Sequence, residues 1–463
     1  MLITSRPVYC GIAAIHRTFS IAAIHRIVCC SIAAVLLTLS ANAQTPWTLS
    51  QCITHAVEHN IGVKQYENQL HQQEVQLSNY KNQRLPDLSA SAGQNFSFGR
   101  GLTSENTYTN TNTSSTSFSL GTSVPLFTGF RIPNAIALGK LNLQAATADL
   151  EKAKNDIRMQ VAQAYVQILY NMEMSDVAHR QIAIDSAQVA RLQALLDVGR
   201  ASEAQLSQQK ASLAQSKLTA TQADNNTQLS LLTLSQLLEL DTPDGFSIVR
   251  PALSQQPSSS LLPSPDLIFA EAVATRPEIE ANALRVKMAD KNIALAQADY
   301  YPQLSLSAGL GSNYYKTSGF QAAPFSTQLK NNFSQYIGLN LSVPIFSRFQ
   351  TRNSVRSARI DLQNQQLALD NTRKQLYKEI QQAYYNTLAA QEKLNSCEQA
   401  KESAAEAFRL MTAKYEQGRA NMTEFNEAKN NYLKTESDLT QARYEHLYQT
   451  ALIQFYRGHE LRF

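Results

Sequence analysis

The sequence predicts a mainly α-helical protein that contains four membrane-type β-strands and is built as an internal duplication. Three observations support this fold class. The same motifs occur twice in one order and register, both copies contain long proline-free segments rich in helix-forming residues, and each copy has two runs in which apolar and polar residues alternate. The repeat takes precedence over the other signals, because missing an internal repeat leads to the wrong fold.

The duplication rests on three anchors that keep one register from the first anchor to the last. A unit of this length is too long for a solenoid repeat, so we interpret it as a duplicated half-molecule. The anchors are Val124-Pro125-Leu126-Phe127 with Val343-Pro344-Ile345-Phe346, Ala164-Tyr165 with Ala383-Tyr384, and Gly199-Arg200-Ala201 with Gly418-Arg419-Ala420.

Residues 1–43 have the pattern of a secretory signal peptide. Basic residues at Arg6, Arg17 and Arg26 precede an apolar stretch, and Ala41-Asn42-Ala43 forms a cleavage site that leaves Gln44 first. The whole chain has 41 Lys+Arg against 37 Asp+Glu, and losing the three arginines leaves 38, so the net charge falls from +4 to +1. This balance excludes nucleic acid as a partner.

The mature chain divides into a first copy over residues 44–240, a connector over 241–265 and a second copy over 266–463. The connector holds five of the 14 prolines, so we expect it to be irregular. Cys52 and Cys397 remain after cleavage, and the sequence alone leaves open whether they pair.

Each copy opens with a predicted helix, over residues 49–84 and 267–300, which stops before Pro86 or Pro302. Two alternating runs follow in each copy, at residues 88–92 and 118–122 and at 304–309 and 337–343. Alternation of this kind predicts a strand with one apolar and one polar face. Long polar turns are expected at residues 99–115 and 311–334.

Two uninterrupted helices are predicted at residues 132–198 and 350–417, each roughly 100 Å long at 1.5 Å per residue. They turn at Gly199 and Gly418, where glycine can adopt the left-handed conformation that ends a helix. The return helices, over residues 202–240 and 422–456, are only half as long. The opening helices have the length to fill the other half, and the connector would then lie midway along the rod.

A secreted chain with two-faced strands and polar turns fits an outer-membrane β-barrel, because only a closed barrel satisfies strand backbones in lipid. Such barrels need at least about eight strands, so four strands per chain require two or three chains. Aromatic residues at the strand–helix junctions fit a girdle at the membrane interface, although they could also cap an ordinary core. They are Phe127, Phe130, Phe346 and Phe349.

Several motifs, in this order and twice, resemble the TolC-type outer-membrane factor family. They are Leu85-Pro86-Asp87-Leu88-Ser89, Tyr301-Pro302-Gln303-Leu304-Ser305, the two Val-Pro-[Leu/Ile]-Phe junctions, Val198-Gly199, Tyr415-Glu416-Gln417-Gly418 and Trp47-Thr48-Leu49-Ser50-Gln51-Cys52. The resemblance implies a homotrimer with a twelve-stranded barrel and a long periplasmic α-helical tunnel. It also implies docking to a periplasmic adaptor and an inner-membrane pump, as the exit duct of an efflux or type I secretion system.

The resemblance assigns functional residues to the helical turns at the periplasmic mouth. Tyr415 matches an aromatic lock position, while Glu424 and Glu427 match acids of the aperture, whose first-copy equivalents are Gln205 and Gln208. Rings of carboxylates near one axis would favour cations. A solvated helix face is the alternative interpretation of these acids.

The same resemblance assigns adaptor contact to the two turns. The residues concerned are Val198, Gly199, Arg200, Gln417, Gly418 and Arg419. Arg419 departs from the family pattern, because the basic lock residue falls one position later, where this chain has Ala420.

No catalytic motif occurs, so neither an enzyme nor a cofactor is expected. Cys52, His55 and His59 share one helix face, but three ligands on one helix without a fourth rarely hold a metal, so no metal site is expected. A secreted coiled-coil scaffold remains the alternative to a channel, and the alternating strands argue against it. The transported substrate, whether drug, metal ion, siderophore or polypeptide, stays open.

Overall fold

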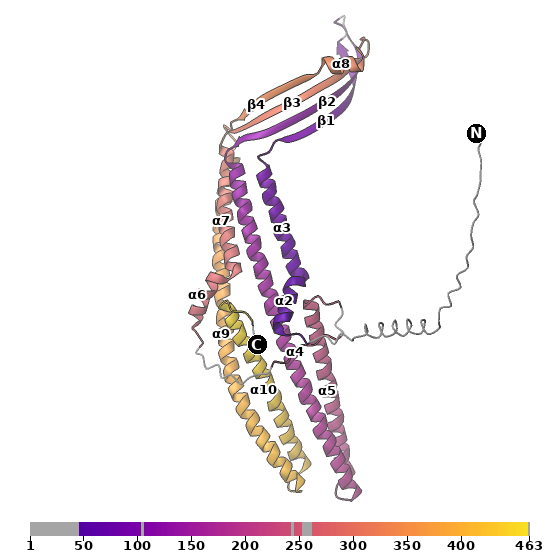
Figure 1. The fold of residues 1–463 in the computed structure, drawn as a ribbon, viewed down its shortest axis with the longest axis vertical. Helices are drawn as coiled ribbons and strands as arrows, with labels where there is room; N and C mark the ends of the chain where they lie inside the picture. Colours follow the sequence, from indigo (N-terminus) through magenta and orange to yellow (C-terminus); the bar gives the residue numbers. More distant parts are fainter. Residues whose placement is uncertain (1–45, 103–105, 242–244, 252–261, 462–463) are drawn as a thin grey trace, which may run out of the picture.

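The computed structural model describes residues 46–102, 106–241, 245–251 and 262–461. It is a long helical rod with a four-stranded sheet at one end (Figure 1). The predicted signal peptide lies outside the described residues. The mainly helical fold class with four strands is confirmed.

The sheet is antiparallel throughout and has the order β1-β2-β3-β4. Its strands are β1 Asp87–Leu102, β2 Tyr108–Thr128, β3 Gln303–Thr317 and β4 Ser334–Ser342. The two copies of the repeat meet at its centre, where Leu120 of β2 lies opposite Leu310 of β3. Each copy of the repeat therefore forms one β-hairpin, and the two β-hairpins lie side by side in one sheet.

The predicted turns between the strands were too long. In the first copy β1 continues to Leu102 and β2 begins at Tyr108, so most of residues 99–115 is paired strand. In the second copy β3 continues to Thr317, and a short helix, α8 Phe325–Asn331, lies before β4. The Thr- and Asn-rich composition misled the prediction, because threonine is a favourable strand residue when its neighbours pair.

Two long helices form the length of the rod. They are α4 Arg131–Asp197 and α9 Gln350–Glu416, each of 67 residues, and their ends lie within one residue of the predicted bounds. The return helices α5 Glu203–Leu237 and α10 Met422–Tyr456 have 35 residues each and occupy the half of the rod farthest from the sheet (Figure 1).

The opening segment of each copy is two helices, not one. In the first copy Asn60 separates α2 Leu49–His59 from α3 Ile61–Asn82, and its side chain caps α3 by accepting from the Gly62 amide. In the second copy α6 Pro265–Thr275 and α7 Pro277–Gln297 are separated at Arg276. A residue before proline is disfavoured in the α conformation, which explains that break.

The longer opening helices complete the half of the rod nearest the sheet. There α3 runs beside α4, and α7 packs between α4 and α9 (Figure 1). The predicted placement of the opening segments is thus seen, although helices of 22 and 21 residues occupy this half of the rod and not single helices of about 35 residues. The described part of the connector lies at mid-rod, where Trp47 and Ile248 form a parallel bridge.

The main hydrophobic core also lies at mid-rod. Val161 and Ile168 of α4 are fully buried there against Cys52 of α2 and Leu234 of α5. The hydroxyl of Tyr165 donates to the Val249 carbonyl at 2.6 Å, which ties the connector to α4. Cys52 and Cys397 are both free thiols. Among the described helices, none is long and apolar enough to cross a membrane.

Candidate functional site

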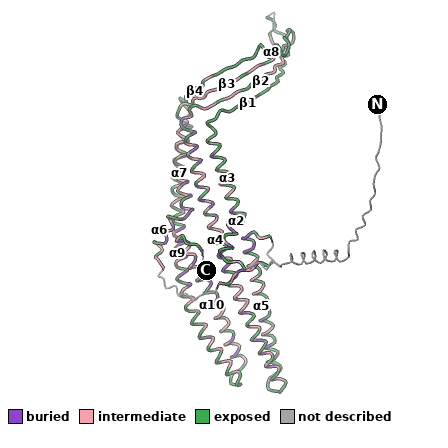
Figure 2. The backbone as a smooth tube through the Cα atoms, viewed as in Figure 1, coloured by how far each residue is buried: buried purple, intermediate pink, exposed green. Residues whose placement is uncertain are grey.

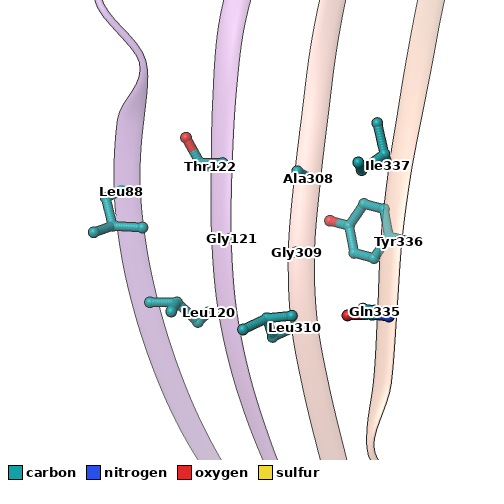
Figure 3. Close-up of a pocket in the computed structure, with 10 residues that line it drawn as sticks. All are labelled: Leu88, Leu120, Gly121, Thr122, Ala308, Gly309, Leu310, Gln335, Tyr336 and Ile337. Carbon is teal, nitrogen blue, oxygen red and sulfur yellow. The ribbon is translucent and has the colours of Figure 1, made fainter.

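In the half nearest the rod, the sheet has one aliphatic and one polar face. Its edge strands β1 and β4 are mostly exposed, whereas β2 and β3 are exposed to half-buried (Figure 2). Cross-strand partners on the first face include Leu306 with Leu339 and Ala308 with Ile337, and Ile337 is 82% exposed. A hollow of about 600 Å³ lies on the sheet, and half of its lining residues are aliphatic, namely Leu88, Leu120, Ala308, Leu310 and Ile337 (Figure 3). Exposed apolar area of this extent marks a surface that contacts lipid or protein.

Serine, asparagine and glycine dominate the opposite face. Ser91 of β1 lies opposite Ser119 of β2, and their hydroxyl groups are 2.7 Å apart. Ser307 of β3 lies opposite Gly338 of β4 in the same way. A strand pattern with one lipid-compatible and one water-compatible face is that of a transmembrane barrel wall.

The sheet is incomplete in one chain. Both β1 and β4 pair on one side only among the described residues. The repeated junction shows the consequence: residues 124–128 pair with β3, whereas the matching residues 343–346 follow the end of β4 without a partner strand in the described chain. Ile345 is 94% exposed. An open edge in lipid would leave backbone groups unpaired, so further chains are required.

The four junction phenylalanines lie where each strand pair meets its long helix. Phe127 and Phe130 make an edge-to-face contact at 5.3 Å between ring centroids, and Phe346 and Phe349 repeat it at 5.5 Å. Phe130 and Phe349 both have the left-handed backbone, with φ of 65° and 61°, immediately before α4 and α9. Phe130, Phe346 and Phe349 are more than half exposed, so they do not cap a core within the described chain.

At the other end of the rod, both hairpin turns have the same hydrogen-bond pattern. Gly199 and Gly418 have φ of +71° and +72°. The Arg200 amide donates to the Leu195 carbonyl at 2.7 Å, and the Arg419 amide donates to the Lys414 carbonyl at 2.8 Å. The six turn residues predicted for adaptor contact, 198–200 and 417–419, are all exposed at this tip.

Two of the predicted aperture residues have a structural role at the start of the return helices. The Glu424 carboxylate accepts from the Asn421 amide at 2.9 Å, and the Gln205 side chain accepts from the Ser202 amide at 3.0 Å. Both belong to capping boxes, in which an acid or an amide serves equally. The Ser-x-x-Gln and Asn-x-x-Glu patterns were visible in the sequence and were missed. Glu427 and Gln208 lie one turn later and are exposed.

Tyr415 connects the end of α9 to α4. Its ring stacks on Phe425 at 4.8 Å, and its hydroxyl donates to Met422 Sδ at 3.3 Å. The Arg191 guanidinium lies 5.7 Å from the ring centroid and forms an ion pair with Glu416 at 3.2 Å. Burial raises the pKa of Tyr415 and outweighs the opposite effect of Arg191. Sequence reasoning missed Arg191, because an arginine on a long helix resembles any solvated residue.

A buried ion pair between α4 and α10 was also missed. Lys429 of α10 donates to Asp185 of α4 at 2.6 Å, and their side chains are only 2% and 0% exposed. Burial acts to raise the pKa of Asp185, but hydrogen bonds from Lys429, Ser216 and Gln181 outweigh it and hold that pKa below its usual value. A single acid and a single lysine, placed in different copies of the repeat, carried no sequence signal.

The Cys52, His55 and His59 cluster forms a packed helix face. Cys52 is fully buried, and burial raises the pKa of its thiol to about 12. The His55 and His59 rings stack at 4.0 Å, and the Trp47 ring meets His55 edge-on at 5.1 Å. The described residues contain no group of three or more His, Cys, Asp or Glu that could hold a metal ion.

Comparisons with known proteins agree with this geometry. The outer membrane efflux protein family model matches residues 53–239 and again residues 268–457. The outer membrane efflux protein BepC of Brucella suis biovar 1 is 23% identical over 365 residues, which cover 77% of this chain and 74% of that protein.

Solved structures share the fold. The CmeC outer membrane channel of Campylobacter jejuni matches with a TM-score of 0.73 at 18% identity, covering 90% of this chain and 87% of that chain. The outer membrane protein VceC of Vibrio cholerae matches with a TM-score of 0.70 at 20% identity, covering 89% and 97%. The double match of the family model also confirms the internal duplication. The chain belongs to the outer membrane efflux protein family.

Proposed function

We propose that this protein is the outer-membrane exit duct of an efflux or type I secretion system. It conducts substrates passively from a periplasmic adaptor and an inner-membrane pump to the outside. The observation that carries the proposal is the exposed sheet with one apolar face and two open edges, continued by 67-residue helices. A lipid-facing wall joined to a rod about 100 Å long fits a duct that crosses the membrane and the periplasm.

Three chains complete the duct. Four strands per chain give a twelve-stranded barrel, in which β1 of one chain pairs with β4 of its neighbour. This pairing continues beyond Ser342, the last residue of β4, along residues 343–346. The polar face lines the lumen, and the junction phenylalanines lie at the membrane interface. Closure removes the open edges, which is the physical reason that several chains must share the barrel. The choice of three chains, rather than two, is supported by the family to which the chain belongs.

The experiment for the duct is fractionation followed by electrophoresis and conductance. We expect to find the protein in the outer-membrane fraction and to see heat-modifiable migration in gel electrophoresis. The purified protein should conduct ions in planar bilayers. A helix-only protein found in the soluble periplasmic fraction would support the scaffold and overturn the duct. The export signal is tested by N-terminal sequencing, for which we expect Gln44 as the first residue.

The mouth of the duct lies at the hairpin tips. Three copies of Glu427 near the axis form a carboxylate ring, with Glu424 contributing charge in addition to its capping role, while Gln208 and Gln205 stand in the first copy. We expect Glu427→Gln to lower the cation selectivity measured in bilayers. The reciprocal variant Gln208→Glu should raise it. Unchanged selectivity in both variants would remove these residues from the mouth.

The exposed turns provide the adaptor contact. Arg200 and Arg419 occupy equivalent positions in hairpins with the same backbone pattern, so they present two similar surfaces per chain, or six per trimer. We expect Arg200→Ala with Arg419→Ala to weaken cross-linking to the adaptor without changing trimer assembly. Arg84→Ala, near the sheet end of the rod, is the matched control and should leave cross-linking intact.

A further inference from the structure

The first helical hairpin consists of α4 and α5, and the second consists of α9 and α10. The seam, where α4 contacts the second hairpin, has a series of polar contacts along its length. Farthest from the tip, the Ser437 hydroxyl of α10 donates to Met174 Sδ of α4 at 3.2 Å. Arg180 and Glu436 follow with an ion pair at 3.0 Å. The Asp185–Lys429 pair comes next, and the seam ends with Arg191, which reaches the last residue of α9.

These contacts differ sharply in exposure. In the Arg191–Glu416 pair at the tip, the side chains are 33% and 56% exposed, and water can replace each partner when the pair separates. In the Asp185–Lys429 pair they are 0% and 2% exposed. Separating that pair would leave a buried charge without its counterion, which is far more costly than breaking a surface pair.

Several side chains of the first hairpin are organised around Asp185. Gln209 and Ser216 of α5 donate to it at 3.0 and 2.5 Å, and Gln181 of α4 donates at 2.6 Å. The amide oxygens of Gln181 and Gln209 are buried and have no hydrogen-bond partner among the described residues. Both amides are therefore oriented by the carboxylate, and α4, α5 and α10 are joined at one point.

We propose that the Asp185–Lys429 pair is a fixed pivot between the hairpins, about which the tip opens while the rest of the seam stays closed. This inference rests on the proposed function, because it concerns how the mouth of the duct widens. The contacts of Arg191 with Glu416 and Tyr415 break, whereas the buried pair persists in both states. Asp185 lies about four helical turns before Gly199 of the first hairpin, and Lys429 lies about three turns after Gly418 of the second hairpin. The moving tip is therefore roughly 17–21 Å long at 1.5 Å per residue.

The test uses reversible cross-links in the full-length trimer, in a background with Cys52→Ala and Cys397→Ser. Single-channel conductance in planar bilayers with potassium chloride is the measurement. The tip variant is Arg191→Cys with Glu416→Cys. The pivot variant is Asp185→Cys with Lys429→Cys, made together with Arg191→Ala so that its tip is released. Both are joined by oxidation or a short bis-methanethiosulfonate linker and released by reduction.

We expect the reduced tip variant to conduct several-fold more than the parent, and cross-linking to reverse this gain. The pivot variant should conduct equally well when linked and when reduced. If cross-linking the pivot lowers the conductance to that of the parent, the pair must separate during opening and the pivot is wrong. A reduced tip variant that conducts no better than the parent also overturns it.

A second cross-link keeps the proposal testable if the buried substitutions prevent assembly. Met174→Cys with Ser437→Cys, again with Arg191→Ala, lies on the closed side of the pivot and leaves Asp185 and Lys429 in place. Its conductance should also be unaffected by linking, and a loss would contradict the pivot. Absence of any conductance in the parent protein would instead overturn the proposed duct, so the two failures are distinguishable.

Discussion

Replacing Lys429 with methionine removes the cation that pairs with Asp185 and keeps a side chain of similar length. Because the two side chains are 2% and 0% exposed, the carboxylate stays buried without its counterion. Removing one partner of a buried ion pair costs about 3–5 kcal/mol. We expect a loss of this size in the free energy of local unfolding at the α4–α10 seam.

Hydrogen exchange of backbone amides, followed by mass spectrometry on the purified trimer, measures that local free energy. The matched control is Lys393→Met, which breaks an ion pair between α9 and α10 in which Lys393 lies 2.8 Å from Glu445. Its side chains are 40% and 43% exposed. An exposed pair contributes about 0–1 kcal/mol, so protection in the control should change little.

A compensating variant separates the loss of the ion pair from damage to packing. Asp185→Leu with Lys429→Met replaces both charges by apolar side chains, and such replacements are often neutral or stabilising by about 1–4 kcal/mol. We expect it to recover most of the protection lost in Lys429→Met. If Lys429→Met loses no more than Lys393→Met, the reasoning from burial is refuted.

Three further predictions concern pH, helix capping and the membrane face. Burial acts to raise the pKa of Asp185, but hydrogen bonds outweigh it and lower that pKa in the folded protein. The ionised carboxylate therefore stabilises the fold fully above the ordinary pKa of 3.8, and this stabilisation is lost as the pH falls through the lower folded pKa. Hydrogen exchange at the seam should accelerate only in that acidic window, and acceleration that starts near neutral pH would contradict the assignment. Asn421→Ala should cost about 1 kcal/mol at the start of α10 and Asn421→Ser much less, measured by exchange of the first-turn amides; equal losses would argue against the cap. Ile337→Arg should destabilise the membrane-inserted barrel by about 2–4 kcal/mol in urea titrations in liposomes, whereas Asn340→Arg on the polar face should be tolerated; the reverse order would exchange the two faces.

The regular parts of the fold could be predicted because their signals are local. Apolar residues at helical spacing, the absence of proline after Pro133 in α4 and throughout α9, and the glycines at 199 and 418 predicted both long helices and their turns. The two-faced strands followed from alternation alone. The breaks at Asn60 and Arg276 were also local, since one is a capping residue and the other precedes a proline, but the continuous periodicity hid them.

The candidate site could be predicted only where it coincides with chain turns. The turn residues and Tyr415 were identified from motifs, and Glu424 was identified without its capping role. Arg191, Asp185 and Lys429 were missed because ordinary charged residues on long amphipathic helices are solvated in most proteins. The partner of each lies in the other copy of the repeat, so no local pattern connects them.

The sequence by itself determined the long helices with their turns, the presence of four two-faced strands, and the division of the chain into two related halves, but not the full length of the strands or the breaks in the opening helices. Those properties depend on residue type and spacing, which are local. Only the tertiary structure decided which side of α4 meets α10, and therefore that Asp185 and Lys429 are buried against each other while Arg191 remains accessible to water. Burial depends on which helices pack together, and the free energy of a charged contact depends on burial far more than on the identity of its residues.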